Sequence, residues 1–426
     1  MPSMLGAGEG RFALYNRVME IAVIGAGASG IFAALAAAQA GKRVTLYDHN
    51  VEIGKKLLVT GSSRCNISNA MVGAEKYACA DEGWMRAFFQ AYPPARLRSL
   101  LDALGIPIYS TADGWYYPLS NSAHSVVEIL RADLLARGVA LALSTQVVDL
   151  RREEGGFALR FPSGEPARER FFDKVVLAAG GKAYPSLGSR GELFPVLARL
   201  GHSVVPLVPA LGPLVVALGK FQDLRGLRFD VGAAVYAGKQ CLGASYGNVI
   251  FTARGLNGPG VMNLSHLAAR RSQEKLSLVL DFCFAFESAL SDENIKQTAS
   301  KNPLAFLNRF FPPKASRFFL EYAGVGSGQE TMPLDPDGLQ KLLAALRSVT
   351  LPVLGIRSFD ESQLSAGGVP VTEVRPETCE SASVSGLYLV GETLDVVGPC
   401  GGYNLHFAFT SGTLAGLDLA GLAAGL

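Results

Sequence analysis

Several features that mark common classes of protein are scarce in this chain of 426 residues. An excess of one charge is missing: 39 Lys and Arg residues stand against 37 Asp and Glu residues, which leaves a net charge of +2. This balance argues against the basic surface of a dedicated nucleic-acid binder but leaves room for a local basic patch. The six cysteines form no C-x-x-C pair, and the five histidines show no ligand spacing. We therefore expect no metal site, no thioredoxin-type redox pair and no disulfide framework, which fits a reducing cytoplasm.

Long apolar runs are also few. Residues 21–40 carry no charge and are long enough to cross a membrane, but three glycines within six residues favour a strand, a turn and a helix. The apolar C-terminus is interrupted by Asp418. We expect a cytoplasmic protein without membrane contact, and the sequence does not indicate its oligomeric state. Residues 1–18 lack periodicity and are interpreted as an N-terminal extension, with Met19 as a candidate start.

Glycine is abundant, and its placement carries most of the information. Residues 20–24 form a short apolar run typical of a strand buried on both faces. Gly25, Gly27 and Gly30 follow it in a G-x-G-x-x-G pattern, which allows a tight turn and a close approach of pyrophosphate to a helix N-terminus. Asp48 ends the next strand, where an acid can accept hydrogen bonds from ribose hydroxyls. The pattern favours FAD or NAD over NADP; the alternative is a glycine turn that binds nothing.

The rest of the chain favours FAD over NAD. Residues 173–181 (DKVVLAAGG) are a second buried strand that ends in glycines, and residues 386–395 (GLYLVGETLD) are a third. Residues 398–404 (GPCGGYN) then open a helix on glycines. A dehydrogenase that uses only NAD has no reason to return to its nucleotide domain so late. The N-terminus of the last helix would also stabilise negative charge on a reduced flavin.

The pattern of apolar and polar residues changes after residue 203. Antiparallel strands are expected first, and residues 287–348 look mainly helical. Before that point, the apolar spacing predicts a helical stretch over 82–104, and the alternation over 139–161 predicts a meander. We predict an α/β fold with an FAD-binding domain in two parts, 19–203 and 356–426, interrupted by a substrate or cap domain over 204–355.

Six segments of the sequence carry a resemblance. The chain resembles the BaiN/RdsA-like family of FAD-dependent oxidoreductases over about residues 19–416. The resemblance implies a two-dinucleotide-type, Rossmann-like FAD-binding domain with an inserted domain that has a β-barrel part and a helical part. Members have been linked to the reduction of unsaturated bonds, including uridine in ribosomal RNA and steroid enones, and to amine oxidation. The segments are IAVIGAGASG (21–30), KKLLVTGSSRCNISN (55–69), AAGGKAYPSLGS (178–189), FTARGLNGPGV (251–261), AGGV (366–369) and GETLDVVGPCGGYN (391–404).

The glycine motif and the resemblance together define a set of expected FAD-binding residues. Within it, Arg64 or Lys56 would hold the pyrophosphate or balance negative charge on the flavin, while Cys65 is more typical of a packing residue than of a redox thiol. The full set is Gly25, Gly27, Ala28, Ser29, Gly30, Asp48, His49, Lys56, Gly61, Ser62, Arg64, Cys65, Asn66, Val147, Ala179, Gly180, Gly391, Glu392, Asp395, Gly401, Gly402, Tyr403 and Asn404.

Candidate catalytic residues are His406, Asn66 and Tyr403. His406 follows the glycine turn closely, and an imidazole can donate a proton near neutral pH, although a packing role is equally consistent with its position. Tyr403 is interpreted as a contact to the flavin ring or substrate rather than as a base. Tyr116 and Tyr117 follow a turn at a position where they can face the cavity, but aromatic packing is the favoured interpretation.

Two departures from the family pattern stand out. Where members commonly read G-G-G-R-C-N, residues 61–66 read G-S-S-R-C-N, which reduces backbone freedom. Where the family has T-H-x-G-x-S-G-P, residues 252–259 read T-A-R-G-L-N-G-P, so the histidine is replaced by Ala253. An acid–base role for that histidine cannot be transferred to this chain.

The favoured function is a flavin-dependent reduction of an activated double bond in a small molecule. No second G-x-G-x-x-G of suitable context exists, so NAD(P)H would dock only transiently. Three alternatives stay open: an amine oxidase, a flavin-binding sensor without turnover, and a ribosomal RNA uridine reductase (dihydrouridine synthase). The last needs a basic groove, for which the candidates are Arg151, Arg152, Arg160, Arg168, Arg170, Arg225 and Arg228, or Arg270, Arg271 and Lys275.

Overall fold

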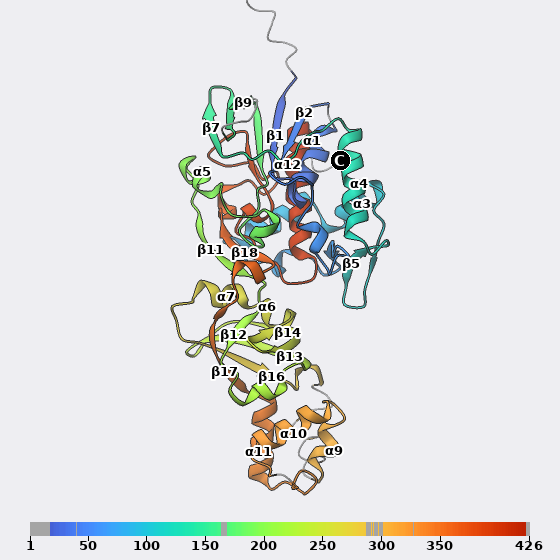
Figure 1. The fold of residues 1–426 in the computed structure, drawn as a ribbon, viewed down its shortest axis with the longest axis vertical. Coiled ribbons are helices and arrows are strands. Elements are labelled where there is room, and N and C mark those ends of the chain that lie inside the picture. Colours follow the sequence, from blue (N-terminus) through green and yellow to red (C-terminus); the bar gives the residue numbers. More distant parts are fainter. Residues whose placement is uncertain are drawn as a thin grey trace, which may run out of the picture.

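The computed structural model describes most of residues 18–422. It leaves out residues 40, 163–167, 287–290, 292, 294–296, 298–300 and 327 within that range. The expected N-terminal extension therefore lies outside the described residues except for Val18. Figure 1 shows an elongated molecule with a parallel sheet and its helices at one end, a barrel in the middle, and helices α9–α11 at the other end.

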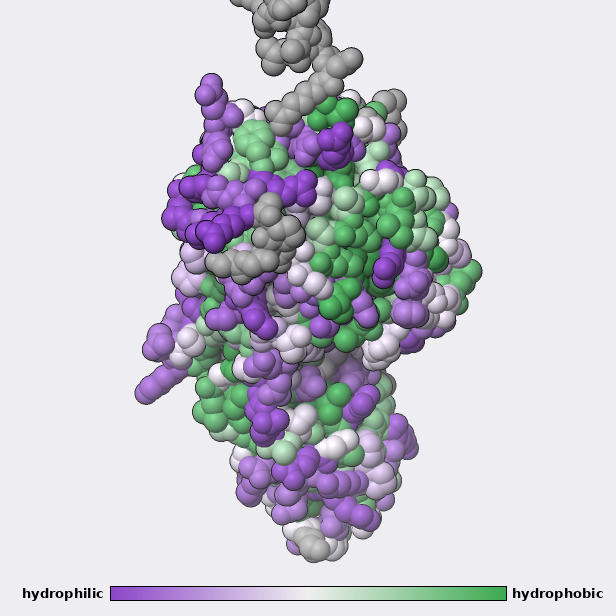
Figure 2. Space-filling view, turned by 45° about the horizontal axis from the view of Figure 1, so that its top comes forward, coloured by the Kyte–Doolittle hydropathy of each residue, from purple (hydrophilic) through white to green (hydrophobic). Residues whose placement is uncertain are grey.

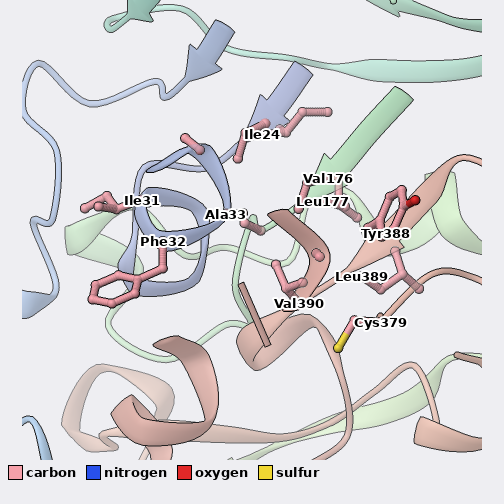
Figure 3. Packing of buried hydrophobic residues seen from close by; sticks show 14 of the residues in the cluster. Ile24, Ile31, Phe32, Ala33, Val176, Leu177, Cys379, Tyr388, Leu389 and Val390 are labelled. Atoms are coloured by element: carbon pink, nitrogen blue, oxygen red, sulfur yellow. The ribbon is translucent and has the colours of Figure 1, made fainter. Parts of the chain in front are cut away.

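A five-stranded parallel sheet in the order β19-β10-β1-β2-β6 forms the centre of the first part. Its middle strand is the apolar run that follows Met19, which has a partner strand on each side and buries every residue except Glu20. Figure 3 shows side chains of this core, such as Ile24, Leu177 and Leu389, packed together. The strands are β1 (Glu20–Ile24), β2 (Arg43–Tyr47), β6 (Ala140–Ala142), β10 (Lys174–Leu177) and β19 (Leu387–Leu389).

Two helices from opposite ends of the chain pack against each other beside this sheet (Figure 1). They are α1 (Ala28–Ala38) and α12 (Tyr403–Ala420). Glycines permit the contact: a Cβ on Gly412 would lie 2.0 Å from the carbonyl oxygen of Ser29, and one on Gly416 would lie 2.5 Å from that of Ala33. The helices therefore meet backbone to backbone, at a distance that larger residues would forbid.

Two expectations about this part of the chain were wrong in detail. The predicted helical stretch over 82–104 is two helices, because Pro93 and Pro94 lack the N–H groups that a continuous helix needs. Residues 140–142 join the parallel sheet beside β2 instead of opening the meander, since the helix α4 before them acts as a crossover. The remaining elements here are α2 (Glu82–Ala91), α3 (Pro94–Ala103), α4 (Ala123–Ala136), α5 (Phe194–Arg199), the meander β7 (Asp149–Glu153), β8 (Gly156–Arg160) and β9 (Glu169–Phe172), and the sheet of β3 (Ser68–Asn69), β5 (Trp115–Pro118) and β4 (Ile108–Ser110).

The second part is a closed six-stranded barrel with attached helices, which confirms the predicted inserted barrel and helical parts. The two share one core, since the ring of Phe282 beside the barrel lies 4.9 Å from that of Phe319 in α10. The elements are β12 (Leu214–Val216), β13 (Arg228–Ala237), β14 (Gln240–Thr252), β15 (Gly255–Asn257), α6 (Pro259–Met262), α7 (Ser265–Arg270), β16 (Leu276–Asp281), α9 (Pro303–Leu307), α10 (Pro313–Tyr322), α11 (Pro336–Arg347) and β17 (Val349–Ile356).

A two-stranded antiparallel ribbon of β11 (Val205–Ala210) and β18 (Leu364–Gly368) joins the two parts. Asp395 fastens this joint: its Oδ1 accepts a hydrogen bond from Arg270 of α7 at 2.5 Å and another from the backbone N–H of Gly367 at 2.8 Å. The carboxylate is buried, so the pair holds the barrel against the parallel-sheet domain. None of the helices within the described residues has the length and apolar character needed to span a bilayer.

Candidate active site

A cavity of about 570 Å³ lies between the parallel-sheet domain and the barrel, a size suited to a cofactor or substrate. Ile24 and Tyr47 line it where β1 and β2 end, and Pro259 and Met262 of α6 line it on the barrel side. Ligands of open parallel sheets bind outside the carboxyl ends of the strands, which is where this cavity begins.

The glycine turn after β1 presents backbone to the cavity. Gly25 has a φ of +106°, and a Cβ there would lie 2.3 Å from the carbonyl oxygen of Ala178, so only glycine fits. Gly27 is the N-cap of α1 and lines the cavity; a Cβ there would meet no described heavy atom within 4 Å. Because Gly27 has no side chain to cap the helix, Ala28 and Ser29 offer their N–H groups and the positive end of the helix dipole to an anion.

Asp48 is held rigidly beside this turn. Its Oδ2 accepts a hydrogen bond from the N–H of Ala26 at 2.7 Å, and its Oδ1 accepts from the backbone N–H and the side-chain amide of Asn50 at 2.8 and 2.9 Å. Oδ2 keeps a second lone pair for a ribose hydroxyl, whereas Asn50 uses both lone pairs of Oδ1. The predicted position of the acid at the end of β2 therefore suits the role expected for it.

Lys56 and Glu392, predicted from distant segments, meet at the cavity wall. The Lys56 Nζ lies 2.8 Å from Glu392 Oε2, while Glu392 Oε1 accepts a hydrogen bond from the N–H of Ser365. Both side chains line the cavity, so their opposite charges cancel locally. Arg64 differs, because no carboxylate of a described residue lies within ion-pair distance of it, and it is the cation more available to negative charge.

Residues 61–65 form a strained turn on the same wall. Gly61, Ser62, Ser63 and Cys65 all have φ between +56° and +64°, in the left-handed region. Each non-glycine residue in that region costs about 1–2 kcal/mol. The two serines stand where the family commonly has glycine, so this chain keeps the turn at the expense of stability.

We expect Ser62→Gly and Ser63→Gly each to raise the free energy of unfolding by about 0.5–1 kcal/mol, because relief of left-handed strain exceeds the extra entropy of glycine in the unfolded chain. Urea unfolding of the FAD-loaded protein measures this. The matched control is Ser120→Gly, an exposed serine without positive φ, which should lower stability slightly. Loss of stability in both turn variants would contradict the strain argument.

The N-terminus of α12 closes the other side of the cavity. Gly401 and Gly402 have φ of +108° and +96°, and a Cβ on Gly402 would lie 2.3 Å from the carbonyl oxygen of Ser68. Asn404 fixes the loop by accepting from the N–H of Gly398 and donating to its carbonyl. A second helix N-terminus thus converges on the same space as that of α1.

The structure brings most of the predicted cofactor-binding residues to this cavity. Those that line it are Gly25, Gly27, Ala28, Ser29, Asp48, His49, Lys56, Gly61, Ser62, Arg64, Asn66, Val147, Ala179, Gly180, Glu392, Gly401, Gly402 and Asn404. Those that do not are Gly30, Cys65, Gly391, Asp395 and Tyr403. Gly30 and Gly391 instead permit close packing, with a Cβ on Gly30 only 1.8 Å from the carbonyl oxygen of Gly25, and Asp395 fastens the joint. Cys65 is buried in the core, where desolvation raises the pKa of its thiol to about 12.

His406 does not occupy the position expected of a proton donor. Its side chain is 1% exposed, does not line the cavity, and has Nδ1 2.7 Å from Ser68 Oγ. Burial lowers the pKa of the imidazole to about 3, so it stays neutral and cannot supply a proton near neutral pH. Tyr403 is likewise turned away, with its ring against Tyr77 and its carbonyl accepting from the Tyr77 hydroxyl. Of the three candidate catalytic residues, only Asn66 reaches the cavity.

Other cavity residues were missed or undervalued at the level of sequence. Trp115 and Tyr117 line the cavity from one face of β5, although packing was the favoured interpretation for Tyr117. The alternation of side chains along a strand was the available signal. Leu211 and Met262 reach it from the joint between the two parts, where no local motif marks them, and Cys400 reaches it from the GPCGGYN segment. Ala253 stands at the position of the family's histidine and is exposed and outside the cavity lining. The lack of a histidine at this position therefore does not alter the cavity.

An orphaned polar atom tests whether a flavin nucleotide fits. Asn66 Oδ1 is buried beside the cavity, and no described residue donates a hydrogen bond to it. Such an acceptor suits a ligand N–H, which an isoalloxazine ring carries. A phosphate site at a glycine turn, an acid for ribose, a second helix N-terminus and this acceptor together define a dinucleotide-binding flavoprotein. Within the described residues, no group of three or more His, Cys, Asp or Glu is arranged to hold a metal ion.

The particular family follows from comparison with known sequences. The family model described as "HI0933-like protein Rossmann domain" matches residues 19–418. The chain belongs to this family, which confirms the resemblance seen in its motifs, and it is an FAD-dependent oxidoreductase.

Individual relatives span nearly the whole chain. The sequence is 35% identical over 406 residues to a 3-dehydro-bile acid delta(4,6)-reductase of Clostridium scindens, covering 93% of this chain and 98% of that protein. It is 28% identical over 404 residues to a ribosomal RNA dihydrouridine synthase of Escherichia coli, covering 93% and 97%. Among solved structures, a 3-ketosteroid-delta4-(5alpha)-dehydrogenase from Rhodococcus jostii RHA1 is similar at 13% identity and a TM-score of 0.48, covering 96% and 98%.

Proposed function

We propose that this protein transfers reducing equivalents from NAD(P)H to an activated carbon–carbon double bond in a small, largely apolar molecule. The carrying observation is the apolar end of the cavity, where Leu211, Met262, Leu364 and Cys400 belong to one small apolar cluster at the joint. The substrate would lie there, between the FAD-binding domain (proposed as 19–203 and 356–426) and the inserted domain (204–355). The similarity to a bile-acid reductase supports a substrate of this kind.

FAD, when bound, would supply the hydride. The N-terminus of α1 would hold the pyrophosphate, and Asp48 would accept from a ribose hydroxyl. Asn66 would accept from the ring. Arg64 and the N-terminus of α12 would favour negative charge on the cofactor. NAD(P)H would dock only briefly, and the six free cysteines are in keeping with the proposed cytoplasmic location.

The test begins with the visible spectrum of the purified protein. We expect flavin bands near about 370 and 450 nm and release of FAD on heating. Anaerobic NADH or NADPH should bleach the 450 nm band, and 4-androstene-3,17-dione should restore it. A colourless protein that takes up no added FAD would refute the proposal. Peroxide release from an amine without nicotinamide would indicate an oxidase, and a flavin resistant to every reductant would indicate a sensor.

A ribosomal RNA substrate is the second candidate, because two relatives that span the whole chain are dihydrouridine synthases. Figure 2 shows hydrophilic residues gathered around β7–β9, where several of the candidate arginines lie. Four of the ten candidate cations (Arg151, Arg160, Arg270 and Arg271) form ion pairs with described acids, however: Arg151 lies 2.6 Å from Glu169, and Arg271 lies 3.3 Å from Glu274. We therefore expect weak binding of rRNA fragments even at low salt; tight binding that falls steeply with salt would favour the RNA substrate instead.

A further inference from the structure

We propose that Tyr117 donates the proton that completes the reduction, with Arg64 as its positioning residue; this rests on the function proposed above. Hydride transfer to an activated double bond leaves one carbon that must gain a proton. A general acid is therefore needed at the cavity, and His406 is not placed to serve.

Strand β5 brings Tyr117 to the cavity. Trp115 and Tyr117 alternate onto the cavity face, while the hydroxyl of Tyr116 accepts a hydrogen bond from Arg98. The indole of Trp115 packs against the glycine loop before α12, since a Cβ on Gly401 would lie 2.8 Å from its Nε1. The same face of β5 thus adjoins the end of the cavity that both parts of the molecule form.

The ring of Tyr117 is locked against the strained turn of residues 61–65. A Cβ on Gly61 would lie 2.9 Å from Tyr117 Cε1, so glycine at this position makes room for the ring. The side chain of Tyr117 is only 2% exposed. An acid held in one orientation needs no reorganisation before it transfers its proton.

Arg64 supplies what a phenol needs to act as an acid. Its Nη2 donates to the Tyr117 hydroxyl at 3.3 Å, and its guanidinium carbon lies 4.3 Å from the ring centroid. Because Arg64 donates to the oxygen, the phenolic hydrogen stays available for another acceptor. The guanidinium also stabilises the phenolate that remains after transfer. Burial raises the pKa of Tyr117, Arg64 opposes the rise and Tyr109 adds to it, so the proton stays in place until a strong base takes it.

Four other groups at the cavity that can carry a proton are less suited. Burial raises the pKa of the Cys400 thiol to about 12, and no described cation lies beside it to stabilise a thiolate. Asp48 already accepts three hydrogen bonds from the protein, and Glu392 is paired with Lys56. Tyr184 lies toward the nucleotide end of the cavity, away from the proposed substrate, because Gly188 of the same loop packs against His49, the neighbour of Asp48.

The step balances as follows for an α,β-unsaturated ketone. The β-carbon receives a hydride supplied by the reduced cofactor, and the two π electrons move onto the carbonyl as an enolate. The Tyr117 O–H bond then breaks, its electron pair stays on the phenolate oxygen, and its proton forms the new bond at the α-carbon. Solvent returns a proton to the phenolate.

The two half-reactions are measured separately by stopped flow on the FAD-loaded protein. Bleaching by NAD(P)H reports donor oxidation, and recovery of the 450 nm band with 4-androstene-3,17-dione reports hydride transfer to the enone, which stays reversible until Tyr117 delivers the proton. We expect Tyr117→Phe to slow recovery at least about 100-fold more than it slows bleaching. Tyr116→Phe is the matched control, because that hydroxyl accepts from Arg98 and Tyr116 does not line the cavity, and it should behave as wild type. Equal rates of recovery in Tyr117→Phe and wild type would overturn the assignment.

Failure of the proposed function has a different signature. If menadione restores the band in wild-type protein but the enone does not, the double-bond reduction is refuted, and the role of Tyr117 falls with it. Arg64→Met gives a second measure that keeps Tyr117 in place. Removal of the cation should raise the pKa of Tyr117, so that the fall in recovery rate at alkaline pH shifts to a higher pH. The pH at which the phenolate absorbance near about 295 nm appears should shift with it; this absorbance is present in wild type and missing in Tyr117→Phe. A fall in rate that does not shift would overturn the role of Arg64.

Discussion

Replacement of Gly27 by aspartate should abolish FAD binding while leaving the fold at least as stable as wild type. The position lines the cavity, and a side chain there meets no described atom within 4 Å, so nothing in the protein opposes it. Gly27 is also the N-cap of α1 with an extended backbone, where aspartate is among the favoured residues. The added carboxylate would occupy the space of the pyrophosphate and repel it. We expect at least a 100-fold weaker affinity for FAD, with apoprotein stability raised by about 0.3 kcal/mol.

Gly27→Asn separates charge from bulk in this experiment. It caps the helix and fills the same space without a negative charge, so its affinity should lie between those of the aspartate variant and wild type. Fluorescence titration of the apoproteins with FAD measures affinity, and urea unfolding of the same samples measures stability. Stoichiometric FAD in purified Gly27→Asp would place the phosphates elsewhere and refute the site described here.

Acidification should destabilise the protein through two buried histidines. Desolvation lowers the pKa of His406 to about 3, and desolvation followed by the charge of Arg270 lowers that of His266 to about 4. Both values lie below the ordinary 6.5, so unfolding takes up protons and the stabilisation is present above about pH 6.5 and lost below it. Each group should account for about 2 kcal/mol of the loss between pH 7.5 and 5.

The measurement is urea unfolding at saturating FAD across this pH range. His406→Gln and His266→Gln should each flatten the dependence by about 2 kcal/mol, whatever their effect at pH 7.5. His124, exposed in α4, gives the matched control, and His124→Gln should leave the slope as it is. A wild-type stability that does not fall between pH 6.5 and 5 would show that neither imidazole is held neutral.

The nucleotide end of the site was predictable because its residues are local. The strand, the glycine turn and the helix that hold Gly25 and Gly27 are contiguous, and Asp48 ends the adjacent strand. A phosphate site needs a tight turn, a close approach of the backbone and a helix N-terminus, and all three lie within one short stretch of sequence. The antiparallel strands after residue 203 and the helical stretch over 287–348 were indicated by the sequence itself, but closure of the strands into a barrel was predictable only through the resemblance.

The substrate end was not predictable because it is assembled from segments far apart in the chain. Tyr117 comes from β5 and Met262 from α6, neither of them within a motif, and Cys400 comes from the glycine motif before α12, which indicated a flavin site rather than a substrate contact. His406 failed for a simpler reason. It lies two residues after Asn404, which turns it by about 200° around the helix axis, away from the face that Asn404 presents to the cavity.

The backbone-to-backbone contact of α1 with α12 has a consequence for biosynthesis. A ribosome releases the chain from its N-terminus at about 5–20 residues per second, so the glycine turn and α1 emerge long before Gly412 and Gly416. Until then the alanine-rich surface of α1 lacks its cover, β19 is missing from the sheet, and the cavity wall formed by residues 392–408 does not exist. Cofactor capture therefore awaits the end of translation, and a nascent or truncated chain is a client for chaperones rather than a partly loaded enzyme.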